Sequence, residues 1–220
     1  MFWAIKDKNG IFLVDAGIKK PYFLNLWNIK NYTTQQELLS ELGITKNMVT
    51  AIIITHLHAD HIDGCEQFPN AMFYLQKKEY VAIKKAFSNN SKNFSHGYYR
   101  RHYRLIEELK TKNRLVLLDG THNITNNIQV EPAPFHTKGT QSVIVKTAKK
   151  TFYIIPDNAY LYENIDKLRP VGICVDRQGN MQYLKRLKQL NPEKNYIIPG
   201  HEPEIFKTFP PVGKNVVELK

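Results

Sequence analysis

The residues of this chain whose types and spacing best suit chemistry lie between Thr55 and His61. Three imidazoles and one carboxylate fall within six residues, directly after the apolar run Ala51-Ile52-Ile53-Ile54; they are His56, His58, Asp60 and His61. Two histidines at i and i+2 point the same way on an extended chain, and the Asp-His pair that follows aims a second pair of ligands at a neighbouring point. One ion would leave some of these groups unused. The pattern therefore favours a two-metal site, and the donor types suit zinc, with iron, cobalt or manganese as substitutes.

A histidine-rich surface loop is the simplest alternative interpretation, since lone histidines are commonly satisfied by hydrogen bonds to the backbone. Four ligand-type residues in six, placed after a strand, favour metal binding instead. The spacing also differs from the helical His-Glu-x-x-His pattern, in which two ligands one turn apart serve a single zinc ion.

Several predicted strands deliver a residue of the same kind from their carboxyl ends. Apolar segments lead directly to His56, His136, Asp157 and His201. Rigid strands that hold reactive loops are a common way to position chemistry. We therefore expect two sheets that meet at one site.

The remaining pattern predicts alternating strands and helices in a single domain of 220 residues. An Asn-Gly turn at residues 9–10 predicts an opening hairpin, and Thr34 with Glu37 forms the sequence signature of a helix-capping box. We expect strands at 2–5, 11–15, 49–54, 71–75, 115–118, 128–130, 142–146, 152–155 and 196–198. We expect helices at 34–42, 77–87, 97–110 and 181–190.

Composition excludes some classes of protein and leaves others open. No apolar run is long enough to span a bilayer, and the first residues lack the features of a signal peptide, so we expect a soluble, cytoplasmic protein with no membrane partner. The two cysteines, Cys65 and Cys174, are far apart and are expected to be free, buried thiols. The net charge of +11 could attract nucleic acid, but the lysines are spread along the chain.

Five motif positions together resemble the metallo-β-lactamase superfamily. Asp15 in Val-Asp-Ala-Gly matches the first motif and residues 56–61 the second, followed by His136, Asp157 and His201 in order. The resemblance implies an α/β fold of the αββα type, a four-layer sandwich of two mixed sheets flanked by helices, over residues 1–220. It also implies two Zn²⁺ ions. His56, His58 and His136 would hold one ion, Asp60, His61 and His201 the other, and Asp157 would bridge them.

Within the superfamily the chain is most similar to the N-acyl homoserine lactonases that quench quorum sensing. This resemblance includes Leu117-Leu118-Asp119-Gly120, Gln141-Ser142-Val143 and, above all, Asp157-Asn158-Ala159-Tyr160. It implies hydrolysis of a small-molecule lactone or ester by a hydroxide shared between cations about 3.5 to 4 Å apart. Tyr160 would stabilise the oxyanion, and Asp60 or Asp157 would pass the proton to the leaving alkoxide. Asp15 is expected to orient the ligand loop by hydrogen bonds without touching metal.

The chain departs from the family pattern beside two of the ligands. Lys138 and Thr140 stand where relatives usually have Pro and His, and Ile155-Pro156 replaces the usual Thr-Gly before the bridging aspartate. The expected ligands are kept, but contacts behind them are expected to differ.

Two other functional classes are open at this point. A phosphodiesterase or nuclease on the same fold is suggested by the bases and aromatic residues of segment 96–104, although an amphipathic helix with Tyr99, Tyr103 and Ile106 facing the core is the favoured interpretation. A catalytically inactive binding module is the other class, but such proteins usually lose ligands. His96, His102 and His122 match no motif and are expected to be surface or packing residues.

Overall fold

The computed structural model describes residues 1–88, 94–190 and 195–219, and its centre is formed by two five-stranded sheets. The first sheet has the order β1-β2-β3-β4-β7, in which β1 and β2 are antiparallel and the other pairs are parallel. Its strands are β1 (Trp3–Asp7), β2 (Gly10–Val14), β3 (Val49–Ile53), β4 (Met72–Gln76) and β7 (Leu115–Leu118). The first sheet is therefore mixed, as expected.

The second sheet has the order β12-β11-β10-β9-β8, and only β11 and β12 are parallel. Its strands are β8 (His122–Asn123), β9 (Ile128–Pro132), β10 (Gln141–Lys146), β11 (Thr151–Ile154) and β12 (Asn195–Ile198). Two small hairpins lie outside the sheets: β5 (Phe94–Ser95) with β6 (Tyr98–Tyr99), and β13 (Pro211–Gly213) with β14 (Val216–Val217).

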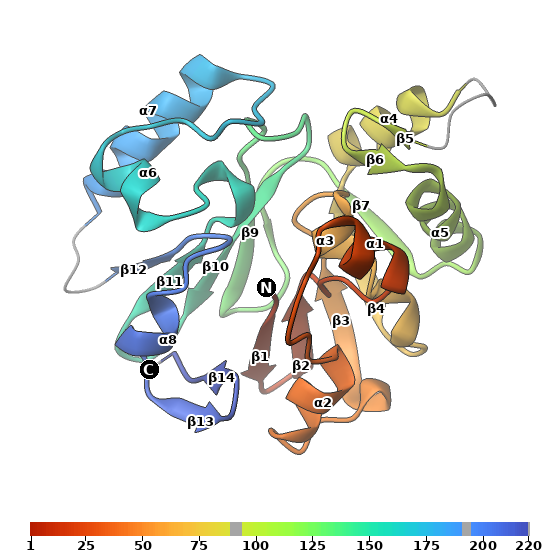
Figure 1. Cartoon of the computed structure of the whole chain (residues 1–220), viewed down its shortest axis with the longest axis horizontal. Coiled ribbons are helices and arrows are strands. Elements are labelled where there is room, and N and C mark those ends of the chain that lie inside the picture. Colours follow the sequence, from red (N-terminus) through yellow and green to blue (C-terminus); the bar gives the residue numbers. More distant parts are fainter. Residues whose placement is uncertain (89–93, 191–194, 220) are drawn as a thin grey trace.

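Helices cover the outer face of each sheet (Figure 1). The first sheet carries α4 and α5 on its outer face, and α6 and α7 cover the second. The α-helices are α1 (Pro21–Leu26), α2 (Gln35–Ser40), α3 (Ala59–Ile62), α4 (Lys77–Ala86), α5 (Arg100–Thr111), α6 (Tyr162–Asp166), α7 (Arg177–Lys188) and α8 (Ile205–Thr208). The 3₁₀ helices are η1 (Lys46–Met48), η2 (Cys65–Gln67) and η3 (Pro156–Asn158). The predicted four-layer αββα fold is confirmed.

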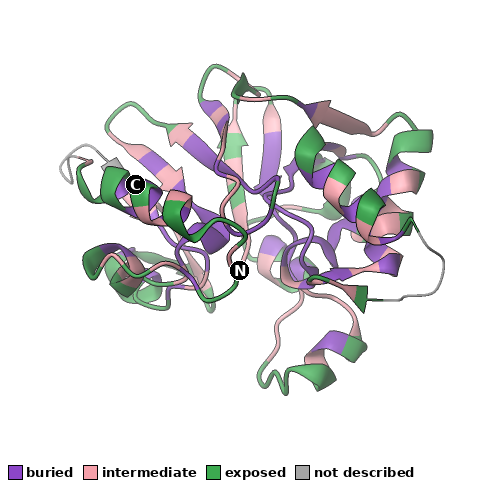
Figure 2. Ribbon diagram, turned by 90° about the horizontal axis from the view of Figure 1, so that it is seen from above, coloured by how far each residue is buried: buried purple, intermediate pink, exposed green. Residues whose placement is uncertain are grey.

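Alternation along the strands separates the apolar core into layers. In β3, Ala51 and Ile53 pack between the two sheets, whereas Ile52 faces the helices of the first half. A third cluster, which includes Leu184 and Leu187 of α7, fills the space under the second sheet. Figure 2 shows buried residues through the centre and exposed residues on the outward faces of the helices. Because strands buried on both faces need apolar residues at every position, β3 is apolar almost throughout.

Two predicted helices differ from the observed ones at their starts. The predicted helix 97–110 begins only at Arg100, because Tyr98 and Tyr99 pair with Phe94 and Ser95 in a hairpin whose turn has positive φ at His96 and Gly97. The predicted helix 181–190 is α7, which begins at Arg177 because the Asp176 side chain accepts a hydrogen bond from the Gly179 amide. The capping box at Thr34 is present as predicted.

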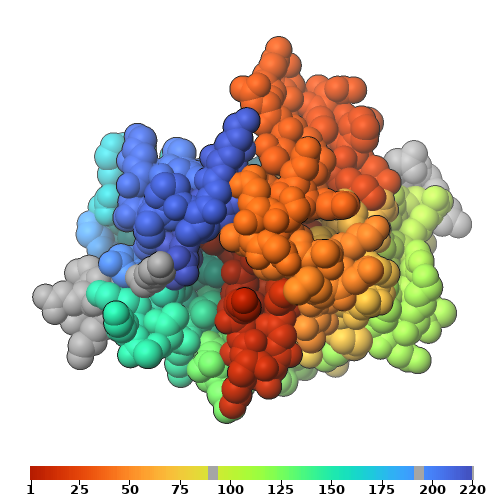
Figure 3. Space-filling model, turned by 90° about the horizontal axis from the view of Figure 1, so that it is seen from below, coloured from red at the N-terminus to blue at the C-terminus, as the bar shows by residue number. Residues whose placement is uncertain are grey.

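The end of the sandwich that includes the N-terminal strand carries an apolar groove of about 780 Å³, lined by β1, α2 and the β13–β14 hairpin among others. Figure 3 shows the N-terminal residues exposed between the C-terminal segment and the segment around α2. The hairpin contacts the first half of the chain through the Lys214 amide, which donates to Glu41 Oε2 at 2.7 Å. No helix in the described ranges is long and apolar enough to cross a membrane.

Packing between the first sheet and its helices predicts that two apolar residues of α4 contribute differently to stability. Ile83 is 0% exposed and Val81 is 53% exposed on the same helix. We expect Ile83→Ala to lower the free energy of unfolding by about 2–5 kcal/mol, because it leaves a cavity in a packed layer. Val81→Ala should change it by less than about 0.5 kcal/mol. Urea denaturation of both variants measures this difference, and equal losses would contradict the assigned packing.

Candidate metal centre

The expected ligand residues lie on loops that leave strands of both sheets and meet between them. His56 and His58 follow β3, and Asp60 and His61 lie on α3 directly afterwards. His136 follows β9, Asp157 lies in η3 after β11, and His201 follows β12. The structure brings all seven predicted side chains into two groups that share Asp157.

The first group contains His56, His58, His136 and Asp157. His58 Nδ1 lies 2.9 Å from His136 Nε2, and Asp157 Oδ2 lies 3.4 Å from His136 Nε2 and 3.9 Å from His56 Nε2. Tetrahedral zinc with bonds of about 2.1 Å places its ligand atoms about 3.4 Å apart. These atoms therefore have the spacing of a four-ligand metal site.

The second group contains Asp60, His61, His201 and the other oxygen of Asp157. Asp157 Oδ1 lies 3.1 Å from His61 Nε2 and 3.1 Å from His201 Nε2. Asp60 Oδ2 lies 3.5 Å from the same two nitrogens. Because Oδ2 faces one group and Oδ1 faces the other, one carboxylate stands between two candidate sites.

Burial and the neighbouring charges give the first group an electrostatic state that suits a cation. Burial and the neighbouring His61 ring hold the pKa of His56 well below its usual value, and burial with His136 lowers the pKa of His58 to about 4. Burial acts to raise the pKa of Asp157, but the adjacent His61 and His201 lower it well below its usual value. At neutral pH the first group thus presents neutral imidazoles beside an ionised carboxylate, which is the donor state that metal ions require.

Two buried nitrogens in the centre provide a test of whether a metal fits. Nε2 of His56 and Nε2 of His61 make no well-directed hydrogen bond within the described part of the chain, although Asp157 Oδ1 lies 3.1 Å from His61 Nε2. Both point into the groups formed by Asp157. A buried polar atom without a partner is costly, and a metal ion would satisfy each of these nitrogens. The residues present therefore fit two cations.

Asp15 orients the second group from behind. Its Oδ2 lies 2.7 Å from His61 Nδ1 and accepts from the Thr55 hydroxyl at 2.7 Å, while Oδ1 accepts from the Thr55 amide at 2.7 Å. It belongs to neither ligand group. A carboxylate on the far nitrogen of an imidazole sets the ring's orientation and raises its basicity as a ligand. The structure thus places Asp15 where a positioning role was expected.

Two rings of the first group, those of His136 and His58, are held by contacts with neighbouring segments. His136 Nδ1 lies 2.7 Å from the Ile173 carbonyl oxygen, and the His136 amide donates to Asn158 Oδ1 at 3.1 Å. His58 packs against Gly97, where an added Cβ would lie only 2.3 Å from His58 Nε2. Gly97 also has a φ of +84°, so both space and conformation favour glycine there.

Tyr160 lies beside both groups. Its ring centroid is 6.1 Å from that of His136 and 5.6 Å from that of His201, and the Tyr160 carbonyl accepts from the His201 amide. Burial and the nearby Asp157 and Asp60 carboxylates raise the pKa of its hydroxyl. The phenol therefore stays protonated at neutral pH.

The residues expected to lie outside the centre do so. Cys65 is buried, His102 is buried against Asp63, and His96 and His122 are exposed. Cys174 is only partly buried, because its segment runs along the surface beside Phe135. None of these five residues belongs to a candidate ligand group among the described residues.

Sequence reasoning missed the roles of Glu79, Asn158 and the Ile173 carbonyl. No sequence pattern around Ile173 indicates that its main-chain carbonyl would contact the His136 ring. Glu79 did carry a signal, since it precedes Ile83 and Phe87 at four-residue spacing and therefore falls on the buried face of its helix.

Fold and centre agree with the comparison to known families. The model of the metallo-beta-lactamase superfamily matches residues 2–201, so the chain belongs to this superfamily. With two candidate metal sites built on an HxHxDH motif, it is a metal-dependent hydrolase of the metallo-β-lactamase fold.

Similar proteins include a probable metallo-hydrolase and several N-acyl homoserine lactonases. A probable metallo-hydrolase of Methanocaldococcus jannaschii is 31% identical over 169 residues, which are 77% of this chain and 64% of that protein. An N-acyl homoserine lactonase of Bacillus cereus is 27% identical over 217 residues, covering 92% of this chain and 80% of the relative.

Solved structures show the same likeness. A quorum-quenching N-acyl homoserine lactone lactonase matches with a TM-score of 0.74 and 25% identity, over 94% of this chain and 81% of that one. A variant of the B. thuringiensis protein AiiA, with N-decanoyl-L-homoserine bound at its active site, matches with a TM-score of 0.75 and 23% identity, over 94% of this chain and 82% of that one.

Metal removal is expected to destabilise the protein. Binding to the folded state alone adds about 2.7 kcal/mol when free metal exceeds its Kd by about a hundredfold. We expect zinc to raise the melting temperature and a chelator to lower it reversibly, with two equivalents bound per chain. Replacing the exposed His122 by Ala should leave both results unchanged. A melting temperature that ignores zinc and chelator would contradict the metal centre.

Proposed function

We propose that this protein is a dinuclear hydrolase that opens the ring of N-acyl homoserine lactones or related lactones and esters. The observation that carries the proposal is the single Asp157 carboxylate, whose two oxygens face two separate ligand groups, with the Tyr160 ring beside both. Such a pair of sites supplies a hydroxide at neutral pH and polarises a carbonyl when cations are bound.

Each proposed ligand has a place in this arrangement. His56, His58 and His136 would hold one cation, Asp60, His61 and His201 would hold the other, and Asp157, which belongs to both groups, would serve both. Zinc suits these donors, with iron, cobalt or manganese as substitutes. Asp60 is also the more accessible carboxylate, since its side chain is 26% exposed against 6% for Asp157. It is therefore better placed to pass a proton to the departing alkoxide.

Tyr160 acts on the carbonyl oxygen of the substrate. Its raised pKa keeps the hydroxyl protonated throughout the usual assay range, so it can donate to the negative charge that develops on that oxygen. The Tyr160 amide donates to Asn164 Oδ1 at 3.0 Å, which fixes the main chain that carries the ring.

Substrate class is supported by the relatives and by the rim of the site. Exposed apolar side chains, Leu161 and Ile173, lie on the segments that contact Tyr160 and His136. Exposed apolar side chains on these segments suit an acyl chain better than a phosphodiester backbone. The relatives named as lactonases share this fold over most of their length.

A lactone panel tests the proposed reaction. Ring opening releases a proton, so a pH indicator should report turnover of N-acyl homoserine lactones by the zinc-loaded protein. We expect Asp157→Asn to abolish turnover and to lower the bound metal, because the bridging charge is lost. Equal rates for the variant and the parent would overturn this role of Asp157.

Replacing Tyr160 by Phe tests the oxyanion contact separately. We expect kcat to fall by about 10²-fold, the usual effect of losing one such donor, while the two bound metals are kept. Tyr196→Phe is a matched control, because Tyr196 is partly buried and stacks on Phe152 at the edge of the core between the sheets, away from both ligand groups. An unchanged kcat in Tyr160→Phe would remove this residue from the reaction.

The nuclease alternative has less support. In segment 96–104 the Tyr98 hydroxyl donates to Glu79, Arg100 lies over the Phe87 ring, and His102 is buried against Asp63. These side chains stabilise the protein itself, so they are not available to stack on bases.

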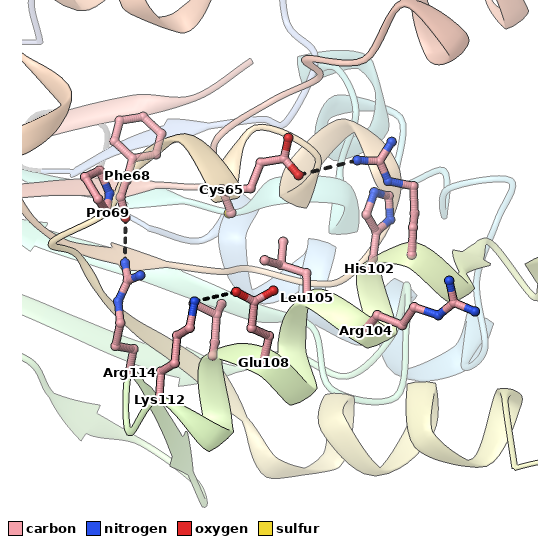
Figure 4. Close-up of a pocket in the computed structure, with 12 residues that line it drawn as sticks. Cys65, Phe68, Pro69, His102, Arg104, Leu105, Glu108, Lys112 and Arg114 are labelled. Carbon is pink, nitrogen blue, oxygen red and sulfur yellow. Dashed lines mark hydrogen bonds and ion pairs between the residues drawn. The ribbon is translucent and has the colours of Figure 1, made fainter.

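A groove of about 580 Å³ between α5 and residues 65–69 collects further basic side chains (Figure 4). Their charges are largely used within the protein. Arg101 pairs with Glu66, Lys112 pairs with Glu108, and Arg114 donates to the Phe68 and Ala71 carbonyls. Absence of binding to labelled RNA at low salt is the expected result, and salt-sensitive binding would favour the alternative.

A further inference from the structure

A second buried carboxylate, Glu79, lies behind the first ligand group. It is on α4, is fully buried, and belongs to neither ligand group. Oε1 accepts from the Leu57 amide at 3.0 Å and from the Tyr98 hydroxyl at 3.1 Å. Oε2 accepts from the Thr137 hydroxyl at 2.7 Å and from the Gly139 amide at 2.9 Å.

Three of these four donors, Leu57, Thr137 and Gly139, belong to the segments that carry the first ligand group, and the fourth, Tyr98, packs against one of its rings. Leu57 lies between His56 and His58, Thr137 directly follows His136, and Tyr98 packs its ring 5.6 Å from that of His58. Glu79 therefore joins the loop that follows β3 of the first sheet to the loop that follows β9 of the second.

Close packing makes the contact specific. A Cβ on Gly139 would lie 2.2 Å from the Glu79 amide nitrogen, so only glycine lets the loop approach closely enough for its amide to reach the carboxylate. Thr140, one of the departures from the family pattern, supports the same turn by accepting from the Thr137 amide at 2.9 Å.

Energetics favour a carboxylate at this position. Burial raises the pKa of Glu79, and the four hydrogen bonds oppose that rise. Removing one acceptor from such a set leaves buried donors without partners, at about 1–3 kcal/mol each. Glutamine at position 79 would replace one carboxylate oxygen with an N–H₂ group, which cannot accept from the two donors that this oxygen serves. The two loops would then separate or rotate.

We propose that Glu79 is a positioning residue for the ion held by His56, His58 and His136, as Asp15 is for the ion held by His61. Each carboxylate holds one ligand group from behind without touching metal. This inference rests on the proposed dinuclear function and assigns to each ion its own supporting carboxylate.

Site-resolved cadmium binding tests the pairing. The three-histidine group and the group with mixed histidine and aspartate ligands should give separate ¹¹³Cd NMR resonances, because their donor atoms differ. We expect Glu79→Gln to weaken only the three-histidine site, by about 10–100-fold, and Asp15→Asn to weaken only the other site by a similar factor. Competition with a chelator during the titration gives each affinity.

Two further variants control the experiment. Glu163→Gln makes the same chemical change on the exposed face of α6 and should leave both resonances unaffected. Tyr98→Phe removes a single donor to Glu79, so it should weaken the three-histidine site by a smaller factor even if Glu79→Gln does not fold.

The outcomes separate the two proposals. In one outcome, the parent binds two ions while Glu79→Gln and Tyr98→Phe weaken both sites equally or weaken neither. That result would overturn only the role of Glu79. A parent that binds no cadmium would overturn the dinuclear function as well, before any variant is compared.

Discussion

The position of one carboxylate constrains the rest of the centre. Asp157 presents Oδ2 to three imidazoles and Oδ1 to two imidazoles and Asp60. Burying this many ligand-type nitrogen and oxygen atoms is unfavourable unless a positive charge lies among them. Both ligand groups must therefore be held at fixed distances from the same side chain, although their members come from both sheets.

The fold meets the requirement in two stages. First, strands of both sheets end at the same face, so β3, β9, β11 and β12 deliver their loops to one region. Second, buried carboxylates tie the loops together, since Asp15 holds Thr55 and His61 and Glu79 spans the loops of Leu57 and Thr137. The strands bring the loops to one region, and the hydrogen bonds orient the rings within it.

The sequence predicted those parts that depend on local pattern. Apolar strands, the Thr34 capping box and the clustered histidines carry their information within a few residues, and the resemblance of the ordered motifs to a known superfamily implied the fold class. Segment 97–110 shows the limit, because the pairing of Tyr98 with Ser95 depends on a turn at His96 that helical periodicity does not reveal. Glu79 could not be assigned a role, because its partners lie up to 60 residues away.

Anomalous scattering from crystals of the zinc-loaded protein tests the central claim most directly. The account predicts two peaks about 3.5–4 Å apart, with one oxygen of Asp157 bound to each. A single peak, or two peaks that do not share Asp157, would contradict it.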